Sequence, residues 1–298
     1  MSLSLEDFRP LELGDRQLFL DMYKSHPPQH SDFAFGNLFG WLHFTNYRLA
    51  RLPEHIILLG RIQDSLQFAY PLGPNNAGVV EEVLALAEEI GAQPKLELID
   101  NEAKAFIDEN FPKLPLESCR DCADYVYTSR NLAELPGKDF LKHRNLINKF
   151  KRSHDYQVEE ITEENFQEIT RFLKRWCLWR DCEGNATLEA ERDALMTVMN
   201  NFGALDLKGI ILRVEGNIQA ISIFEELRPD TAVVHYEKAD VDFEGIYKVI
   251  NQETAHRLKD HYGFINREHD LGVPGLRKAK ERYRPHHMVE VYRTVVQL

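Results

Sequence analysis

The residues best suited to chemistry lie in one stretch of this chain, FINREHDLGVPGLRKAKERYRP, at residues 264–285. After an apolar pair, five consecutive residues carry an ionisable group or an amide: Asn266, Arg267, Glu268, His269 and Asp270. Because successive side chains of a strand point to opposite faces, Asn266, Glu268 and Asp270 are expected to share one face. Paired carboxylates shift each other's pKa, so Glu268 or Asp270 could act as general base for an acceptor amine. The alternative is that Asp270 caps the following helix and Glu268 pairs with Arg267 at the surface.

Basic side chains follow directly and recur in a second segment. Residues 277–287 hold five bases: Arg277, Lys278, Lys280, Arg282 and Arg284. Residues 138–152 hold six: Lys138, Lys142, Arg144, Lys149, Lys151 and Arg152. Arg277, Lys280 and Arg284 follow the i, i+3, i+7 spacing of one helical stripe. We expect the two segments to line a channel for phosphate groups, with Asn266 and Arg267 as further substrate-binding candidates. The alternative is that both are solvated helices whose bases pair with nearby acids.

The elements that must position these residues form an internal repeat. FRPLELGDRQLFLDMYKSH, from Phe8, lines up with YQVEEITEENFQEITRFLKRW, from Tyr156. HIILLGRIQDSLQFAYPLG, from His55, lines up with KGIILRVEGNIQAISIFEEL, from Lys208, and each reads as an antiparallel hairpin. A helix, a strand, a helix and a strand follow in both copies. The pattern predicts an α/β (α+β) fold, duplicated, with two mixed sheets and packed helices.

The repeat also predicts the domain organisation. We expect an N-terminal domain at residues 1–137, a basic bridging helix at 138–154, and a C-terminal domain at 155–298 that carries the site. The first copy reads LIDNEAKAFIDENFPKL where the second is rich in bases, so the basic charge is specific to the second copy. Tyr236 and Glu237 are expected to end a central strand, which makes them pocket candidates. Trp176 is expected to pack in the core.

Composition limits the class of protein. The chain has 298 residues, 43% of them apolar, and a net charge of −12, which argues against a protein coated in nucleic acid. It has no apolar run long enough to span a membrane, and its first twenty residues lack the pattern of a secretion signal, so a cytoplasmic protein is expected. The cysteines, at 119, 122, 177 and 182, complete no known zinc pattern; we expect reduced thiols and no metal.

Two long stretches carry a family resemblance. YTSRNLAELPGKDFLKHRNLINKF, at residues 127–150, and INREHDLGVPGLRKAKERYRP, at residues 265–285, resemble the bacterial family related to the C-terminal catalytic domain of phosphatidylglycerol lysyltransferase. The similarity extends over nearly the whole chain. It implies a tandem GNAT-like acyltransferase fold, akin to the Fem-type enzymes that take an aminoacyl group from charged tRNA. Tyr283 could donate a proton to a leaving group, as a tyrosine does in some GNAT enzymes, or serve as a core anchor.

The resemblance and the residues together define the expected reaction. GNAT domains that use acyl-CoA have a Gly-rich turn before the central helix, but here EKADVDFEGIYKV offers one glycine and several acids that would repel a pyrophosphate. Acetyl-CoA is thus the less favoured donor. We expect aminoacyl transfer from charged tRNA, or another phosphate-bearing donor, to an amine or hydroxyl of a small molecule, peptide or lipid head. The alternatives are acetyl-CoA-dependent N-acetylation and a non-catalytic scaffold that binds an anion.

Overall fold

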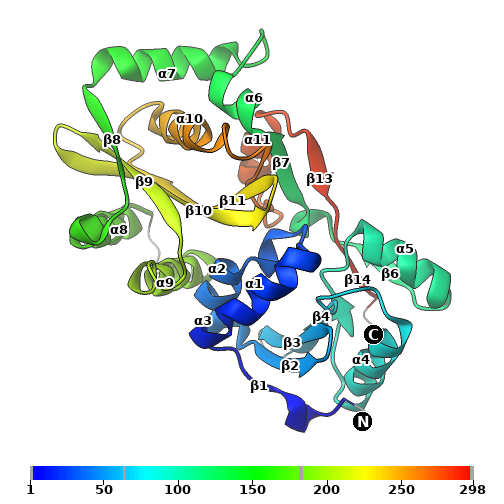
Figure 1. Ribbon diagram of the computed structural model, residues 1–298. Helices are drawn as coiled ribbons and strands as arrows, with labels where there is room; N and C mark the ends of the chain where they lie inside the picture. Colours follow the sequence, from blue (N-terminus) through cyan, green and yellow to red (C-terminus); the bar gives the residue numbers. More distant parts are fainter. Residues whose placement is uncertain (1–2, 63–64, 181–183, 296–298) are drawn as a thin grey trace. The chain divides into compact units, whose positions relative to one another are not determined.

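The computed structural model describes residues 3–62, 65–180 and 184–295 (Figure 1). These residues form two compact units. The first comprises residues 1–124, 269–273 and 288–298, and the second comprises residues 125–268 and 274–287. Within the described ranges, no helix is both long and apolar enough to cross a membrane.

The first unit is built on a sheet with the strand order β1-β2-β3-β4-β5. Its strands are β1 (Arg9–Pro10), β2 (Arg48–Leu52), β3 (His55–Ile62), β4 (Ser65–Ala69) and β5 (Leu96–Glu97). Its helices are α1 (Arg16–Ser25), α2 (Phe35–Gly40), α3 (Leu42–Thr45), α4 (Ala77–Glu89) and α5 (Asn101–Asn110). Neighbouring strands run antiparallel except β4 and β5, which are parallel and joined through α4. Ile57, Phe68 and Val83 are completely buried where α4 packs on the sheet.

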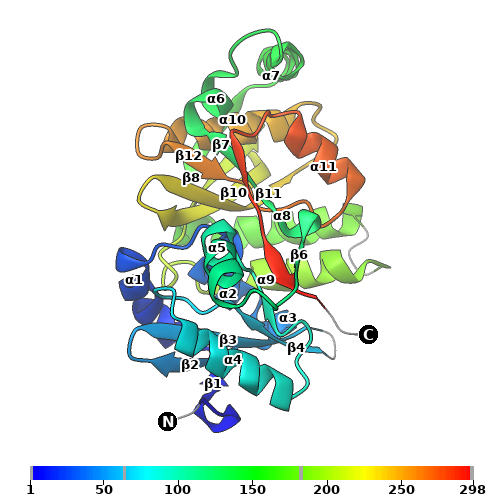
Figure 2. The same ribbon diagram turned by 90° about the vertical axis from the view of Figure 1, so that its right-hand side faces the viewer.

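The second unit is built on a sheet with the order β13-β7-β12-β11-β10-β9-β8. Its strands are β7 (Asp124–Thr128), β8 (Tyr156–Glu160), β9 (Lys208–Val214), β10 (Asn217–Arg228), β11 (Thr231–Ala239), β12 (Phe264–Asn266) and β13 (His287–Val289). Its helices are α6 (Ser129–Glu134), α7 (Leu141–Ser153), α8 (Phe166–Arg180), α9 (Ala186–Asn200), α10 (Ile246–Leu258) and α11 (Pro274–Glu281). Figure 1 shows α10 on one face of this sheet and α8 and α9 on the other. In Figure 2, α7 covers the side of α10 that faces away from the sheet.

The predicted duplication is confirmed, with one correction. The series β1 to β5 and the series β8 to β12 share the same order, the same antiparallel pairings and one final parallel pair. Each copy has three consecutive antiparallel strands instead of the predicted hairpin. Residues 55–69 form β3 and β4, which occupy the sheet positions of β10 and β11. The predicted match of residues 55–73 to 208–227 is therefore displaced by one strand, because β2 and β11 were not counted.

The last strand of each copy is exchanged. β7, expected to close the first copy, pairs antiparallel with β12, with Ile265 opposite Tyr127. β14 (Tyr292–Thr294), expected to close the second copy, pairs with β6 (Leu116–Ser118) in the first unit. Tyr125, Val126 and Tyr127 are all at most 2% exposed, as expected for a strand covered on both faces. The boundary of the units consequently lies at residue 124, not at the predicted 137, and α7 belongs to the second unit.

All three described cysteines, Cys119, Cys122 and Cys177, are disulfide-bonded and so differ from expectation. Cys119 and Cys122 are joined by a disulfide in the first unit, so the prediction of free thiols is wrong for this pair. Cys182 lies outside the described residues. Within the described part of the chain, no group of three or more His, Cys, Asp or Glu side chains is placed to hold a metal ion.

Candidate functional site

The turn after β12 does not continue the strand as predicted. β12 ends at Asn266, and Glu268 has a φ of 59°, in the left-handed region, so the alternation of faces stops there. The prediction that Asn266, Glu268 and Asp270 share one strand face is therefore wrong. Instead, Asn266 Oδ1 accepts a hydrogen bond from the backbone N–H of Glu268 at 2.7 Å, which stabilises the turn.

Asp270 is a structural residue of the first unit. It is completely buried, its Oδ1 accepts a hydrogen bond from the Gly272 N–H at 2.9 Å, and its Oδ2 lies 3.4 Å from the Arg120 guanidinium. Glu268 belongs to the second unit and contacts other residues there. The predicted pairing of the two carboxylates is replaced by these separate contacts. The structure thus gives Asp270 a structural role, as the alternative expected, with a hydrogen bond to Gly272 in the turn that precedes α11.

Glu268 is held by a buried histidine. His235 lies on β11 at a β-bulge, where Val234 and Tyr236 pair with successive residues of β10. Its Nδ1 is 2.8 Å from Glu268 and its Nε2 is 2.8 Å from Glu225. Burial lowers the pKa of His235, but the hydrogen bonds and charges of the two carboxylates outweigh this and raise it to about 10. His235 is therefore an imidazolium at neutral pH, and it engages the carboxylate that was predicted to be the general base.

Arg267, Glu237 and Tyr283, which are all predicted site residues, do lie close together. The Arg267 guanidinium forms an ion pair with Glu237, and its Cζ lies 5.0 Å from the centre of the Tyr283 ring. Glu237 Oε1 also accepts a hydrogen bond from Asn251 Nδ2 at 3.2 Å. The Lys248 ammonium lies 4.9 Å from the Tyr283 ring centre. Tyr236, next to Glu237 on β11, is buried.

His143 completes this group, which we call the Tyr283 cluster: His143, Glu237, Lys248, Asn251, Arg267 and Tyr283. The His143 ring centre lies 4.5 Å from that of Tyr283. Several buried polar atoms of the cluster have no hydrogen-bond partner among the described residues: both ring nitrogens of His143, Nε of Arg267 and Oδ1 of Asn251. Buried polar groups are nearly always hydrogen-bonded in folded proteins. The unused groups therefore mark the cluster as a candidate binding site.

The charges of the cluster are unbalanced. Lys248 and Arg267 face a single acid, Glu237. Burial, together with the charge of Arg267, lowers the pKa of Lys248 to about 8, and burial with the charge of Lys248 lowers the pKa of His143 to about 4. Burial also raises the pKa of the Tyr283 hydroxyl, which stays protonated. The cluster thus offers a neutral imidazole, a readily deprotonated amine and a phenol. While Lys248 is protonated, the excess positive charge favours an anionic ligand.

Lys280 differs from its predicted role. Only 8% of it is exposed, and its ammonium donates hydrogen bonds to the backbone carbonyls of Arg267 and Glu268. Tyr127 donates from its hydroxyl to the Lys280 carbonyl at 2.9 Å. The prediction that Lys280 faces an anion together with Arg277 and Arg284 is therefore wrong. Lys280 instead fixes the backbone that carries Arg267.

The other predicted bases of α11 and its C-terminal turn lie at or near the surface. Lys278 is exposed and Arg277 is half-buried, both on α11. Arg284 lies beyond the helix, has a φ of 55°, and is 3.8 Å from Asp139. This contact joins the second basic segment to the start of the first within the second unit.

The bases of α7 mostly have local partners. Lys149 pairs with Glu244, and Lys151 lies 3.2 Å from Glu253 on α10. Arg144 donates hydrogen bonds to the carbonyls of Leu135 and Gly137, and Lys142 is exposed. These contacts match the alternative of pairing with nearby acids for Lys149 and Lys151, whereas Arg144 binds backbone carbonyls instead.

Sequence reasoning missed His143, Lys248 and Asn251. A signal for two of them exists, because Lys248 and Asn251 are three residues apart and so lie on one face of α10. The signal for His143 lies in its neighbours Phe140 and Ile147, which predict that this face of the basic helix is buried.

The doubled strand order with a bulged central strand defines a tandem GNAT-like protein. A solved tandem GNAT protein from the clavulanic acid biosynthesis pathway is similar over 97% of this chain and 98% of that one, at a TM-score of 0.50 and 10% identity. Residues 23–295 match the family described as phosphatidylglycerol lysyltransferase, C-terminal, and the chain belongs to this family. The resemblance predicted from residues 127–150 and 265–285 is thereby confirmed.

Two further solved structures are similar. A conserved protein of unknown function from Bacteroides thetaiotaomicron VPI-5482 is 30% identical, with a TM-score of 0.91, over 97% of this chain and 99% of that chain. L-PGS from Bacillus licheniformis is 15% identical, with a TM-score of 0.67, over 96% of this chain and 92% of that one. No curated protein matches the chain.

Proposed function

We propose that this protein is an acyltransferase that moves an aminoacyl group from charged tRNA, or another phosphate-bearing donor, to an amine or hydroxyl acceptor. The family membership supports acyl transfer, and the family's name points to a lipid head group as one acceptor. The observation that carries the proposal is the Tyr283 cluster, where buried donors and acceptors without partners surround an excess of positive charge.

The cluster has the groups that this reaction requires. The acceptor loses a proton to the neutral amine of Lys248, whose lowered pKa suits a general base near neutral pH. The acceptor then attacks the ester carbonyl of the donor, and the ribose oxygen leaves with the proton of Tyr283. Arg267 stabilises the negative charge that develops on the carbonyl oxygen. Solvent returns the proton from Lys248 to Tyr283.

The start of α10 argues for a donor other than acetyl-CoA. Gly245, its N-cap, has a φ of 94°, and a Cβ there would lie 2.8 Å from the Leu146 carbonyl of α7. Asp240 and Glu244 precede the helix. The Leu146 carbonyl, close to the first turn of the helix, adds further negative potential. A pyrophosphate at this helix terminus would meet this carbonyl and these acids instead of free N–H groups.

The direct test is transfer of radiolabelled amino acids from a charged tRNA pool to phosphatidylglycerol vesicles, soluble amines and peptides. Wild-type protein should label at least one acceptor. Lys248→Met and Tyr283→Phe should lose this activity, while Lys208→Met, an exposed change in the same unit, should keep it.

Two outcomes would replace the proposal. Salt-sensitive binding of tRNA without labelled product would favour the non-catalytic scaffold. Stabilisation by acetyl-CoA, with acetylation of an amine, would favour the N-acetyltransferase.

A further inference from the structure

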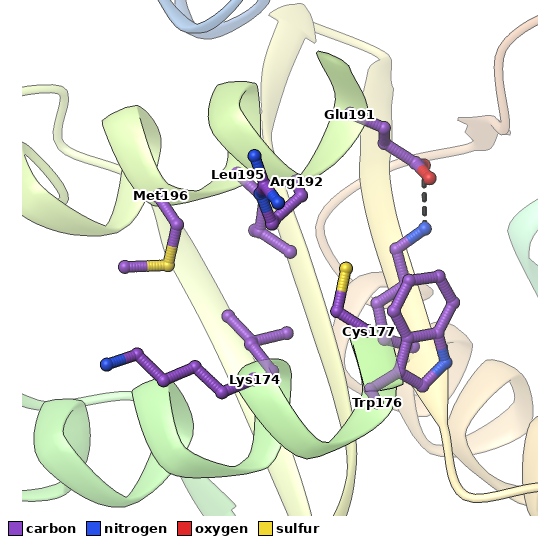
Figure 3. A pocket seen from close by; sticks show the side chains of 9 residues that line it. Lys174, Trp176, Cys177, Glu191, Arg192, Leu195 and Met196 are labelled. Carbon is purple, nitrogen blue, oxygen red and sulfur yellow. Dashed lines mark ion pairs between the residues drawn. The ribbon is translucent and has the colours of Figure 1, made fainter. Parts of the chain in front are cut away.

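A second candidate site lies on the other face of the second unit's sheet. A cavity of about 300 Å³ opens between α8, α9 and the end of β11 (Figure 3). Its walls are formed by nine residues: Leu173, Lys174, Trp176, Cys177, Glu191, Arg192, Leu195, Met196 and Lys238. None of these belongs to the Tyr283 cluster. The volume and the mostly apolar lining are those of a small-molecule site.

The cavity has a partly buried ion pair in its wall, with the Glu191 side chain 26% exposed. The Lys238 side chain is only 9% exposed, and its ammonium lies 2.7 Å from Glu191 Oε1, the contact drawn at Glu191 in Figure 3. The same ammonium lies 4.4 Å from the centre of the Trp176 ring. A buried ion pair contributes little net stability, because the cost of removing both charges from water offsets their attraction. Its presence beside a cavity therefore calls for another explanation.

Lys238 supplies the enclosed hydrogen-bond donor of the wall. Of the other two cations, Lys174 is exposed, and Arg192 is paired with Asp193, at 2.7 Å, and with Glu189, at 3.6 Å. Lys238 is therefore the cation most enclosed by the apolar wall. The Lys238 ammonium has three N–H donors, and Glu191 accepts from one of them, so the others can bind a singly charged carboxylate. A phosphate with two negative charges would be repelled more strongly by Glu191.

We propose that this cavity binds a small monocarboxylate with an apolar body. The carboxylate accepts a hydrogen bond from the Lys238 ammonium, and the hydrocarbon lies against Leu173, Leu195 and the Trp176 indole. Trp176 is held in place by its own hydrogen bond, since its Nε1–H donates to the Tyr247 hydroxyl at 3.3 Å. This site is independent of the proposed acyl transfer.

The test is calorimetric titration of the full chain with octanoate, octylamine and octanol as probes, without any acyl donor. Octanoate should bind at least tenfold more tightly than octanol, and octylamine should bind most weakly. Across butanoate, hexanoate and octanoate, affinity should rise roughly threefold to fourfold per methylene until the cavity is full. Equal binding of octanoate and octanol, or a preference for octylamine, would overturn the proposal.

Two variants locate the binding. Lys238→Met should weaken octanoate at least tenfold and leave octanol unchanged, whereas the exposed Lys208→Met should change neither. Met196→Trp, at a half-buried position of the wall, should fill the cavity and abolish binding of every probe. If Lys238→Met does not fold, Met196→Trp decides, because unchanged octanoate binding in that variant would show that the carboxylate binds elsewhere.

Discussion

The two copies of the repeat differ most where their fourth and fifth strands end. In the first copy, Asn76 caps α4 through a side-chain hydrogen bond, and the third residue of that helix is Val79. In the second copy, the glycine before α10 offers no side-chain cap, and the third residue of the helix is Lys248. The same helix position therefore serves the apolar core in one copy and the Tyr283 cluster in the other.

The fifth strands show the same contrast. After β5, Asp100 caps α5 by accepting a hydrogen bond from the Ala103 N–H at 2.8 Å. After β12, Arg267 reaches Glu237, and the buried Lys280 ammonium holds the turn. The first copy follows the ordinary rules of helix capping, and the second departs from them in favour of buried charge. Such departures are expected at functional sites, which supports the prediction that the site lies in the second copy.

The largest expected effect is on activity. Lys248→Met should lower the rate of aminoacyl transfer about 100-fold, because it removes the proposed general base. In the wild type, the rate should rise with pH up to about 8 and then level, as the Lys248 ammonium loses its proton. The measurement is a pH–rate profile of both proteins. If the variant keeps this pH-dependent rise, the titrating group is not Lys248.

Lys280→Met should destabilise the second unit by about 2 kcal/mol, because two buried carbonyls lose a charged donor. A control change in the first copy is Lys104→Met on α5. Lys104 pairs with Asp108 at the surface, so its loss should be nearly neutral. Urea denaturation measures the free energy of unfolding of each variant. Equal values for the two variants would mean that Lys280 does not support the turn.

His235→Gln should cost about 1–2 kcal/mol at pH 6.5, and the cost should shrink as the pH rises to about 10. The folded protein raises the pKa of His235 above its ordinary value of 6.5, so the stabilisation is complete below pH 6.5 and is lost as the pH rises through about 10. Urea denaturation across this range measures the difference. If the difference in free energy of unfolding between the wild type and the variant widens with pH, His235 is not the imidazolium assigned here.

The smallest effect is expected at the surface of α7. Lys149→Ala should change the free energy of unfolding by no more than about 0.5 kcal/mol, because both partners of its pair with Glu244 are largely exposed. Transfer activity should also persist if α7 pairs only locally. A strong, salt-dependent loss of tRNA binding in this variant would instead support the predicted phosphate channel.

The sequence was most informative about the order of the helices and strands and least informative about which strands pair with each other. The periodicity of residues 8–25 and 156–176 predicted the duplication correctly. The exchange of β7 could not be predicted, because an apolar segment such as DYVYT indicates a buried strand without identifying its sheet. Glu237 and Arg267 were found as candidates because they lie at the ends of predicted strands, and Tyr283 was found through the family resemblance. Lys280 was misassigned because a lysine on a basic helix is normally exposed, and two carbonyls from a distant turn bury this one.

The exchanged strands have a consequence for synthesis on the ribosome. The residues of the first unit up to 124 emerge early, but β6 has no partner until residues 292–294 have been made. The Leu96 N–H likewise waits for the Thr294 hydroxyl, 3.2 Å away in the folded chain. The first unit is therefore unable to complete its fold until residues 292–294 have been synthesised. Prematurely terminated chains would expose an unpaired edge, which is the kind of surface that promotes aggregation.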